Sequence, residues 1–181
     1  LCSEILTSTG TTSENPSVGY FIVTVGEQRE AHRSEVVASM AQSFLGTRIG
    51  CAQCHNHPLE KYTQDDFYRF SGFFSRLRLD RKDPKEGVTT LFANLKDDEQ
   101  KRPVGVTQPR TGEFLNPRPI DRAPVETNKE TDPRQALAKW MIDPANESFH
   151  GALVNRVWKH FMGMGLVEPV DDLRSSNPPS N

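Results

Sequence analysis

Apolar residues recur at helical spacing between residues 33 and 47 of this 181-residue chain. An α-helix carries its apolar side chains three and four positions apart, so that they form one stripe. Glycine commonly follows the last residue of a helix, and here Gly46 and Gly50 do so. The pattern predicts a helix over residues 33–47 that leads to Cys51. Its stripe comprises Val36, Val37, Met40, Ala41, Phe44 and Leu45.

A second apolar stripe begins after Thr63. Threonine is a good helix N-cap, and the acidic pair at 65 and 66 suits the positive end of the helix dipole. A stripe of this kind is either ordinary core or one wall of a cofactor pocket. Its position just after Cys51 leaves both interpretations open, so Phe67 and Phe70 are candidate cofactor contacts. The stripe consists of Phe67, Phe70, Phe74 and Leu77, with Phe73 beside it.

Two further helices are predicted near the end of the chain. Asp132 is a suitable N-cap for the first, which Pro133 opens and Pro144 limits. The second is expected over residues 148–162, where Gly163 ends it. One face of this second helix carries Leu153, Val157, His160 and Phe161.

The other segments carry weaker signals. The residues up to about position 12 predict a short helix, and Tyr20–Val25 predicts a strand from its β-branched and aromatic content. The stretch 80–131 is rich in charge and proline and predicts an irregular connector. Within it, Val104–Thr107 and Phe114–Leu115 flank a turn and predict a small β-hairpin. The run Asp97–Arg102 is expected to be solvated surface.

Together these elements predict a mainly α fold in three parts. A helical part over residues 1–79 contains Cys51, the connector with its hairpin covers 80–131, and a second small helical part covers 132–181. The chain opens without Met or a signal peptide and ends in turn-forming residues. We therefore expect it to be part of a longer polypeptide, and the second helical part to be the start of a larger domain.

Composition argues against two classes of partner. The chain has 22 basic and 24 acidic residues, for a net charge of −2. This charge provides no positive electrostatic potential to attract the phosphates of a nucleic acid. The sequence has no apolar run long enough for a bilayer span, so membrane insertion is not expected. The hydrophobic fraction of 35% predicts a modest apolar core.

Cys51-Ala52-Gln53-Cys54-His55 is the most specific chemical pattern in the chain. Cys-x-x-Cys-His is the attachment signature of a c-type haem, because the two thiols form thioethers and the adjacent imidazole reaches the iron. Haem c is therefore the expected cofactor. A zinc site is one alternative, although Cys2 is the one remaining cysteine and zinc requires four ligands. A redox dithiol is another, although no βαβ pattern precedes it.

The second axial ligand of such a haem would determine its role, because a strong sixth ligand favours electron transfer and an open position permits catalysis. His55 is the expected proximal ligand. His160 lies on the apolar face of its predicted helix and is the candidate distal ligand of the iron. The alternative is that His160 is a histidine at the edge of the core. His57 is expected to bond a haem propionate, pin its loop or ligate a neighbouring haem. Arg156 is expected either to reach a propionate or to form a structural salt bridge.

Three stretches resemble known sequences. Phe44–Gly46, Cys51–Pro58 and Tyr62–Tyr68 together resemble a domain of unknown function from large secreted planctomycete proteins. Leu137–Trp140, Val154–His160 and Gly165–Asp172 resemble the second domain of unknown function that regularly follows it. The resemblance implies an extracytoplasmic bacterial protein whose relatives often carry a separate planctomycete-type cytochrome c domain. Met164 stands where that second domain tends to have arginine.

The leading hypothesis is a c-type haem protein that passes electrons to a redox partner protein or to other haem domains, within a larger protein or complex. A haem enzyme of oxidase or peroxidase type with an open distal site is the first alternative. A structural or carbohydrate-associated module stabilised by zinc is the second.

Overall fold

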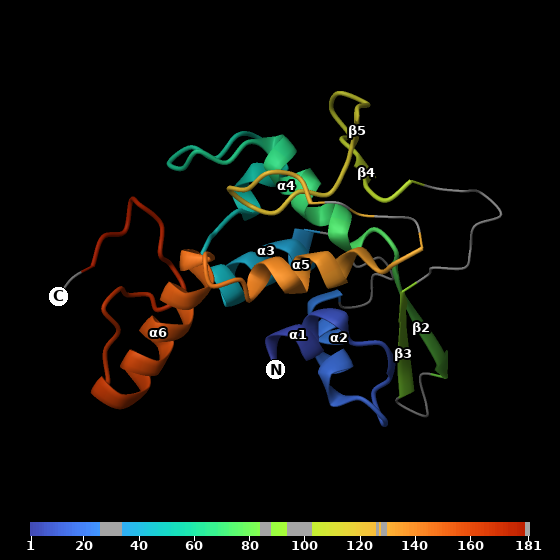
Figure 1. Cartoon of the computed structure of the whole chain (residues 1–181), viewed down its shortest axis with the longest axis horizontal. Coiled ribbons are helices and arrows are strands. Elements are labelled where there is room, and N and C mark those ends of the chain that lie inside the picture. The colour runs from blue at the N-terminus through green and yellow to red at the C-terminus, as the bar shows by residue number, and fades with distance from the viewer. Residues whose placement is uncertain (26–33, 84–87, 94–102, 126, 128–129, 180–181) are drawn as a thin grey trace.

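The computed structural model describes residues 1–25, 34–83, 88–93, 103–125, 127 and 130–179. These residues form a mainly α fold with a small antiparallel sheet and a separate hairpin (Figure 1). The helices are α1 (Cys2–Thr7), α2 (Gly19–Val25), α3 (Ser34–Leu45), α4 (Gln64–Ser71), α5 (Pro133–Met141) and α6 (Glu147–Met162). Short 3-10 helices are η1 (Pro16–Val18), η2 (Gly50–Gln53) and η3 (Gly72–Phe74).

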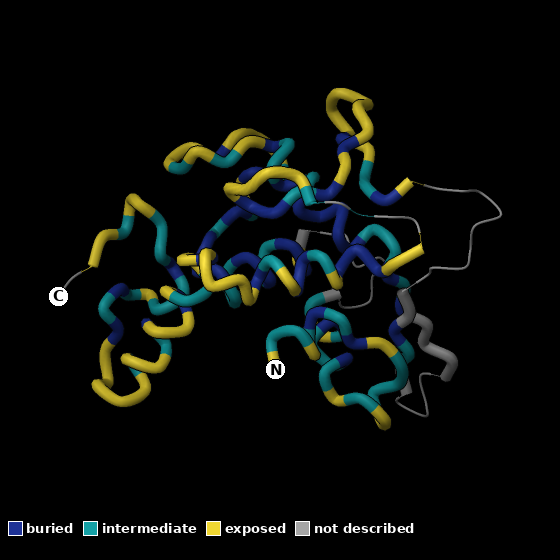
Figure 2. Tube along the Cα trace, in the orientation of Figure 1, coloured by how far each residue is buried: buried dark blue, intermediate teal, exposed yellow. Residues whose placement is uncertain are grey.

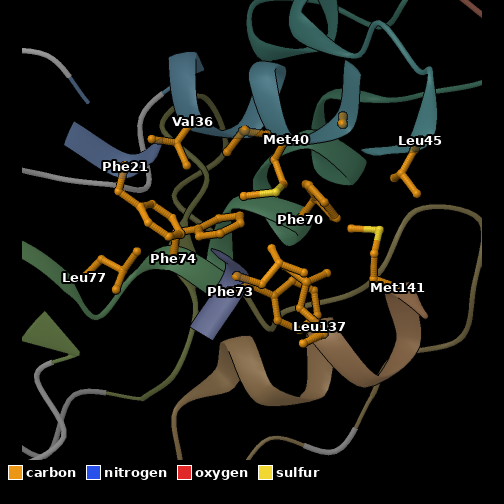
Figure 3. Close-up of a cluster of buried hydrophobic side chains, with 14 of the residues drawn as sticks. Phe21, Val36, Met40, Leu45, Phe70, Phe73, Phe74, Leu77, Leu137 and Met141 are labelled. Atoms are coloured by element: carbon orange, nitrogen blue, oxygen red, sulfur yellow. The ribbon is translucent and has the colours of Figure 1, made fainter. Parts of the chain in front are cut away.

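The helices of both ends of the chain share one aromatic core. The phenylalanines of α4 and η3 lie between Met40 of α3 and the side chains of Leu137 and Met141 of α5 (Figure 3). Phe70 contacts Phe73 and Phe74 edge-on, at centroid distances of 6.1 and 6.2 Å. The predicted parts 1–79 and 132–181 are therefore packed together.

The sequence correctly located the longer helices. The helix expected over 33–47 is α3, which ends before Gly46. Thr63 caps α4 through a capping box in which its side chain accepts from the Asp66 amide. Asp132 caps α5, and Pro133 is the first helical residue as expected. The helix expected over 148–162 begins one residue earlier, at Glu147.

The strand predicted over Tyr20–Val25 is wrong, because these residues belong to α2. Val18 and Phe21, three positions apart, are fully buried, whereas Val23 is 83% exposed. That spacing places the helical face with Val18 and Phe21 on the core and directs Val23 to solvent. Asn15 caps the 3-10 turn that leads into α2, so tertiary packing overrode the strand preference of the β-branched residues.

The connector contains more structure than its composition predicted. The hairpin expected there is present as β4 (Val106–Thr107) and β5 (Phe114–Leu115), with Val106 opposite Leu115. A second pair, β2 (Leu77–Asp83) and β3 (Val88–Ala93), was missed, and β1 (Gly10–Thr11) joins β3 to complete a three-stranded sheet in the order β1-β3-β2. The run Asp97–Arg102 lies outside the described residues.

Arg134 links the first and last helices of the core. Its guanidinium is fully buried, with Nε donating to Oδ1 and one Nη atom donating to Oδ2 of Asp132. The other Nη donates to the carbonyl oxygens of Leu6 and Ser8, at 3.0 and 2.9 Å. The guanidinium also lies over the ring of Phe21, 5.5 Å from its centroid.

We predict that Arg134→Ala lowers the free energy of unfolding by about 3–5 kcal/mol, because it leaves the Asp132 carboxylate buried without its partner. Urea unfolding followed by circular dichroism measures the loss. Arg110→Ala is the matched control, since that side chain is exposed, and should change stability by less than about 0.5 kcal/mol. Equal losses in the two variants would contradict the assignment.

Candidate functional site

The Cys51 segment leaves the end of α3 through a tight turn at Gly46. Gly46 adopts a left-handed φ of +63°, and a Cβ at this position would lie 2.7 Å from the side chain of Leu173. The amide of Leu173 donates to the Gly46 carbonyl at 2.8 Å. Glycine is therefore required both by the backbone angle and by the close approach of the C-terminal segment.

Both thiols of the motif are accessible. Cys51 lies in η2, and Cys54 follows it with its amide donating to the Cys51 carbonyl at 3.4 Å. The two residues are exposed, and neither forms a disulfide. The four-residue turn therefore presents two thiols three positions apart at the surface, as attachment to the two vinyl edges of one porphyrin would require.

A polar network fixes this turn against α4 and the β4–β5 hairpin. Gln64 donates through Nε2 to the Gln53 carbonyl at 2.8 Å, and its own amide donates to Asn56 Oδ1 at 3.1 Å. Gln108 of the hairpin region donates to Gln64 Oε1 at 3.2 Å. Both glutamines are buried, so their hydrogen bonds are shielded from water.

His55 is exposed, and a backbone carbonyl fixes the orientation of its ring. Its Nδ1 lies 2.8 Å from the carbonyl oxygen of Asn56. A carbonyl oxygen can only accept, so Nδ1 carries the proton and Nε2 retains its lone pair. This is the arrangement in which a backbone carbonyl orients a metal-binding imidazole.

His57 has the opposite arrangement. The ring is 6% exposed, and its Nδ1 accepts from the Leu59 amide at 3.2 Å. The neutral ring therefore carries its proton on Nε2, which has no hydrogen-bond partner among the described residues. The His57 amide donates to the Tyr62 carbonyl at 2.8 Å and closes the loop. Of the three roles expected, pinning the loop is the one these contacts describe.

The two aromatic candidates lie inside the core. Phe67 and Phe70 are fully buried, and their rings pack against Tyr68, Phe73 and Phe74. A ring enclosed by protein has no free face for a cofactor. Of the two interpretations of the stripe, ordinary core is therefore the one that the packing supports.

Arg156 has a contact that the sequence did not indicate. Its guanidinium donates to the carbonyl oxygens of Ser43 and Gln42, near the end of α3. The Gln42 carbonyl also accepts from the Gly46 amide at 3.2 Å, and a cationic donor at this end of α3 interacts favourably with the helix dipole. Arg156 thus joins α6 to α3 through these two carbonyl oxygens.

His160 is exposed on α6. The apolar face on which it was placed faces outward, with Leu153 51%, Val157 46% and Phe161 75% exposed (Figure 2). The buried positions of α6 are Ala152 and Asn155 instead. The C-terminal end of α6 points away from the Cys51 segment (Figure 1). The structure therefore does not bring His160 to the motif.

No pattern in the sequence indicated the charged cluster that the C-terminal segment places beside the motif. Arg174 binds Asp172 through two hydrogen bonds of 2.5 and 2.7 Å, and Arg48 lies 3.5 Å from the same carboxylate. Arg174 lowers the pKa of Asp172, and Asp172 in turn raises the pKa of Arg174, to which Cys51 also contributes. Arg48 and Cys51 lie more than a hundred positions before Asp172 and Arg174, and no spacing rule connects the two pairs.

The described residues fit a covalently attached haem at the surface. The thiols of Cys51 and Cys54 are accessible, and the Nε2 of His55 is free to bind iron. The same residues do not fit a haem enclosed by the phenylalanine core. Across the ranges that the structure describes, no three side chains of His, Cys, Asp or Glu converge as a zinc site would require. In the same ranges, no helix is long and apolar enough to cross a membrane.

Tyr62 lies next to the motif loop in an environment that disfavours its ionised form. Burial and the nearby Asp121 carboxylate raise its pKa to about 12. Its hydroxyl donates to Asp121 at 3.3 Å, and Lys61 pairs with the same carboxylate at 2.9 Å. The pKa values of Tyr20 and Tyr68 are also raised, in both cases chiefly by burial.

Two family models match the chain. Residues 6–79 match PSCyt2, described as a protein of unknown function (DUF1549), and residues 133–181 match PSD1, described as a protein of unknown function (DUF1553). These matches confirm the resemblance to the paired planctomycete domains. No curated protein and no solved structure is significantly similar to the chain.

The three tyrosines predict a late alkaline titration. A folded tyrosine whose pKa lies above that of the unfolded chain contributes stability that is fully present below pH of about 10 and is lost as pH rises towards its folded pKa. We expect the last rise in tyrosinate absorbance near pH 12 and its absence in Tyr62→Phe. Tyr68→Phe is the control and should retain that rise. Ionisation of Tyr62 near its ordinary pKa in the folded protein would contradict the environment described.

Proposed function

We propose, from the geometry of the Cys51 segment, that the chain is a c-type haem protein. The paired planctomycete domains that it carries are both described as of unknown function. The observation that supports this most is the conformation of His55. The Nδ1–H of His55 donates to the carbonyl of Asn56, so that Nε2 is available beside two exposed cysteines.

Each residue of the motif has a separate task in this proposal. Cys51 and Cys54 hold the porphyrin by thioether bonds, and His55 is the proximal ligand. The buried bonds of Gln64 and Gln108 keep the turn in one conformation. A bound haem would supply iron that exchanges one electron at a time between its ferrous and ferric states.

Surface attachment favours electron transfer over chemistry in a closed pocket. An exposed site allows a redox partner protein, or another haem domain of a larger complex, to approach closely. The resemblance to secreted planctomycete proteins supports a location outside the cytoplasm, where this chain would work as one module of a longer polypeptide.

A haem enzyme of oxidase or peroxidase type is the second candidate. The observation that favours it concerns His160, the candidate sixth ligand, which is exposed on α6, a helix whose C-terminal end points away from the Cys51 segment (Figure 1). An iron without a sixth protein ligand would bind small molecules. Carbon monoxide decides between the candidates, since rapid binding by the native ferrous protein supports the enzyme and resistance to binding supports the electron carrier.

The central test is the mass of the protein after export from a bacterium that attaches haem covalently. We predict a gain of one haem, the pyridine haemochrome spectrum of a thioether-linked haem, and loss of the covalent haem in Cys51→Ser/Cys54→Ser. His55→Ala should perturb the iron spin state or prevent assembly of the holoprotein.

Cys2→Ser is the matched control for the cysteine variants. Cys2 is half-buried, and burial raises the pKa of its thiol to about 11, so it is protonated and unreactive at neutral pH. This variant should retain full haem. A wild-type protein of unmodified mass under the same conditions would refute the proposal.

A further inference from the structure

Helix α6 packs on the rest of the protein through its polar side. Asn155, one of its two buried residues, bonds the backbone of the segment that follows the helix. Arg156 donates to carbonyl oxygens near the end of α3, and Lys159 pairs with Glu168 at 2.9 Å. A surface helix normally does the reverse and places its apolar side on the core.

The opposite side of α6 is apolar and faces solvent (Figure 2). Six large apolar residues lie there, with exposed fractions between 41% and 75%. At 3.6 residues per turn they occupy one half of the helix circumference, and the charged residues of the same span, Arg156 and Lys159, lie on the other half. The six are Leu153, Val154, Val157, Trp158, Phe161 and Met162.

This outward face is large enough to be an interface. Its six residues leave roughly 700 Å² accessible to solvent, whereas the largest apolar patch on a typical monomer measures about 300–600 Å². Each partner in a specific interface of standard size contributes about 800 Å². A second copy of the chain that covered the face would therefore bury nearly the area that a stable dimer needs.

The order of the six residues suits an interface between identical copies. They occur as three adjacent pairs that begin four positions apart, so the set of positions is the same when read from either end. A two-fold axis through the middle of the set would pair two α6 helices antiparallel. Leu153 of one copy would then be level with Met162 of the other, and Val154 with Phe161. Every level of the pair is apolar in both copies, which is the self-complementarity that a two-fold interface requires.

A membrane surface fits the outward face less well. Helices that lie on a bilayer carry Lys and Arg beside their apolar side, where the cations meet anionic lipid headgroups. Here Arg156 and Lys159 are held on the packed side, by the Ser43 carbonyl and by Glu168. The observations therefore favour a protein surface that presents apolar side chains in the same arrangement.

We propose that the outward face of α6 is the interface of a homodimer, in which two copies of this chain pair their α6 helices antiparallel. The face belongs to the part of the chain that matches the second family model. Cys51 and Cys54 are not part of it, and the C-terminal end of α6 points away from their segment (Figure 1). The inference therefore holds whether or not haem is attached.

Sedimentation equilibrium of the full chain tests the inference by measuring mass as a function of concentration. We expect a dimer at micromolar concentrations and a reversible shift to monomer on dilution. Val157→Asp places a charge at the centre of the face and should raise the dissociation constant by about a hundredfold or more. Val23→Asp is the matched control, because Val23 is 83% exposed on α2, and should leave the dissociation constant unchanged.

A mixing experiment distinguishes a two-fold interface from a general loss of structure. Position 157 lies next to the axis, so its side chains in the two copies would be neighbours. Val157→Asp and Val157→Lys should each be monomeric alone, and an equimolar mixture should restore the dimer through the opposite charges. A mixture that remains monomeric would overturn the two-fold pairing.

The remaining outcomes are equally decisive. A wild type that stays monomeric throughout the micromolar range overturns the inference, whether lipid, another protein or further residues of a longer polypeptide then cover the face. A dimer that persists unchanged in Val157→Asp also overturns it, because the interface must lie elsewhere. Circular dichroism shows whether the variants fold. If Val157→Asp does not, Phe161→Glu decides, because Phe161 is 75% exposed and contributes little to the core.

Discussion

The structure depends on an aromatic core that neither half of the chain supplies alone. Phe70 and Phe73 lie between α3, from the first half, and α5, from the second (Figure 3). Each fully buried side chain of this size contributes about 1.5–3 kcal/mol, whereas an exposed ion pair contributes about 0–1 kcal/mol. The core therefore joins the two halves, and the surface ion pairs adjust local geometry.

This core has a direct consequence for the site. Because the phenylalanines after Thr63 pack between α3 and α5, their rings are enclosed by the core and are not exposed beside the motif. The Cys51 segment is instead displaced to the surface, where Gln64 and Gln108 fix it by hydrogen bonds. Each such bond contributes about 1 kcal/mol net, but leaving a buried partner unpaired costs more, which favours a single loop conformation.

The C-terminal segment brings a second layer of polar contacts to the same place. Arg156 caps α3, Asn155 bonds the backbone of Val167 and Val170, and Asp172 holds Arg174. α6 is therefore attached by its polar side chains more than by its apolar ones. The two matched domains meet both in the core and near the motif, where the Leu173 amide donates to the Gly46 carbonyl.

The sequence by itself determined the main helices and the chemistry of the motif. Helical periodicity located α3, α5 and α6 because each has an apolar stripe with a capping or ending residue, and the Cys51–His55 spacing identified the candidate attachment site without any structure. Tertiary structure decided what local pattern cannot specify. α2 is a helix because Phe21 packs on the core. Leu79 and Leu91 are buried in a sheet within a polar connector. Leu153 and Val157 face outward although their stripe resembled a buried one. The position of Arg174 beside Cys51 likewise depends on a chain reversal between residues more than a hundred positions apart. Such contacts arise from the total free energy of packing, whereas a sequence pattern reports the preference of one segment alone.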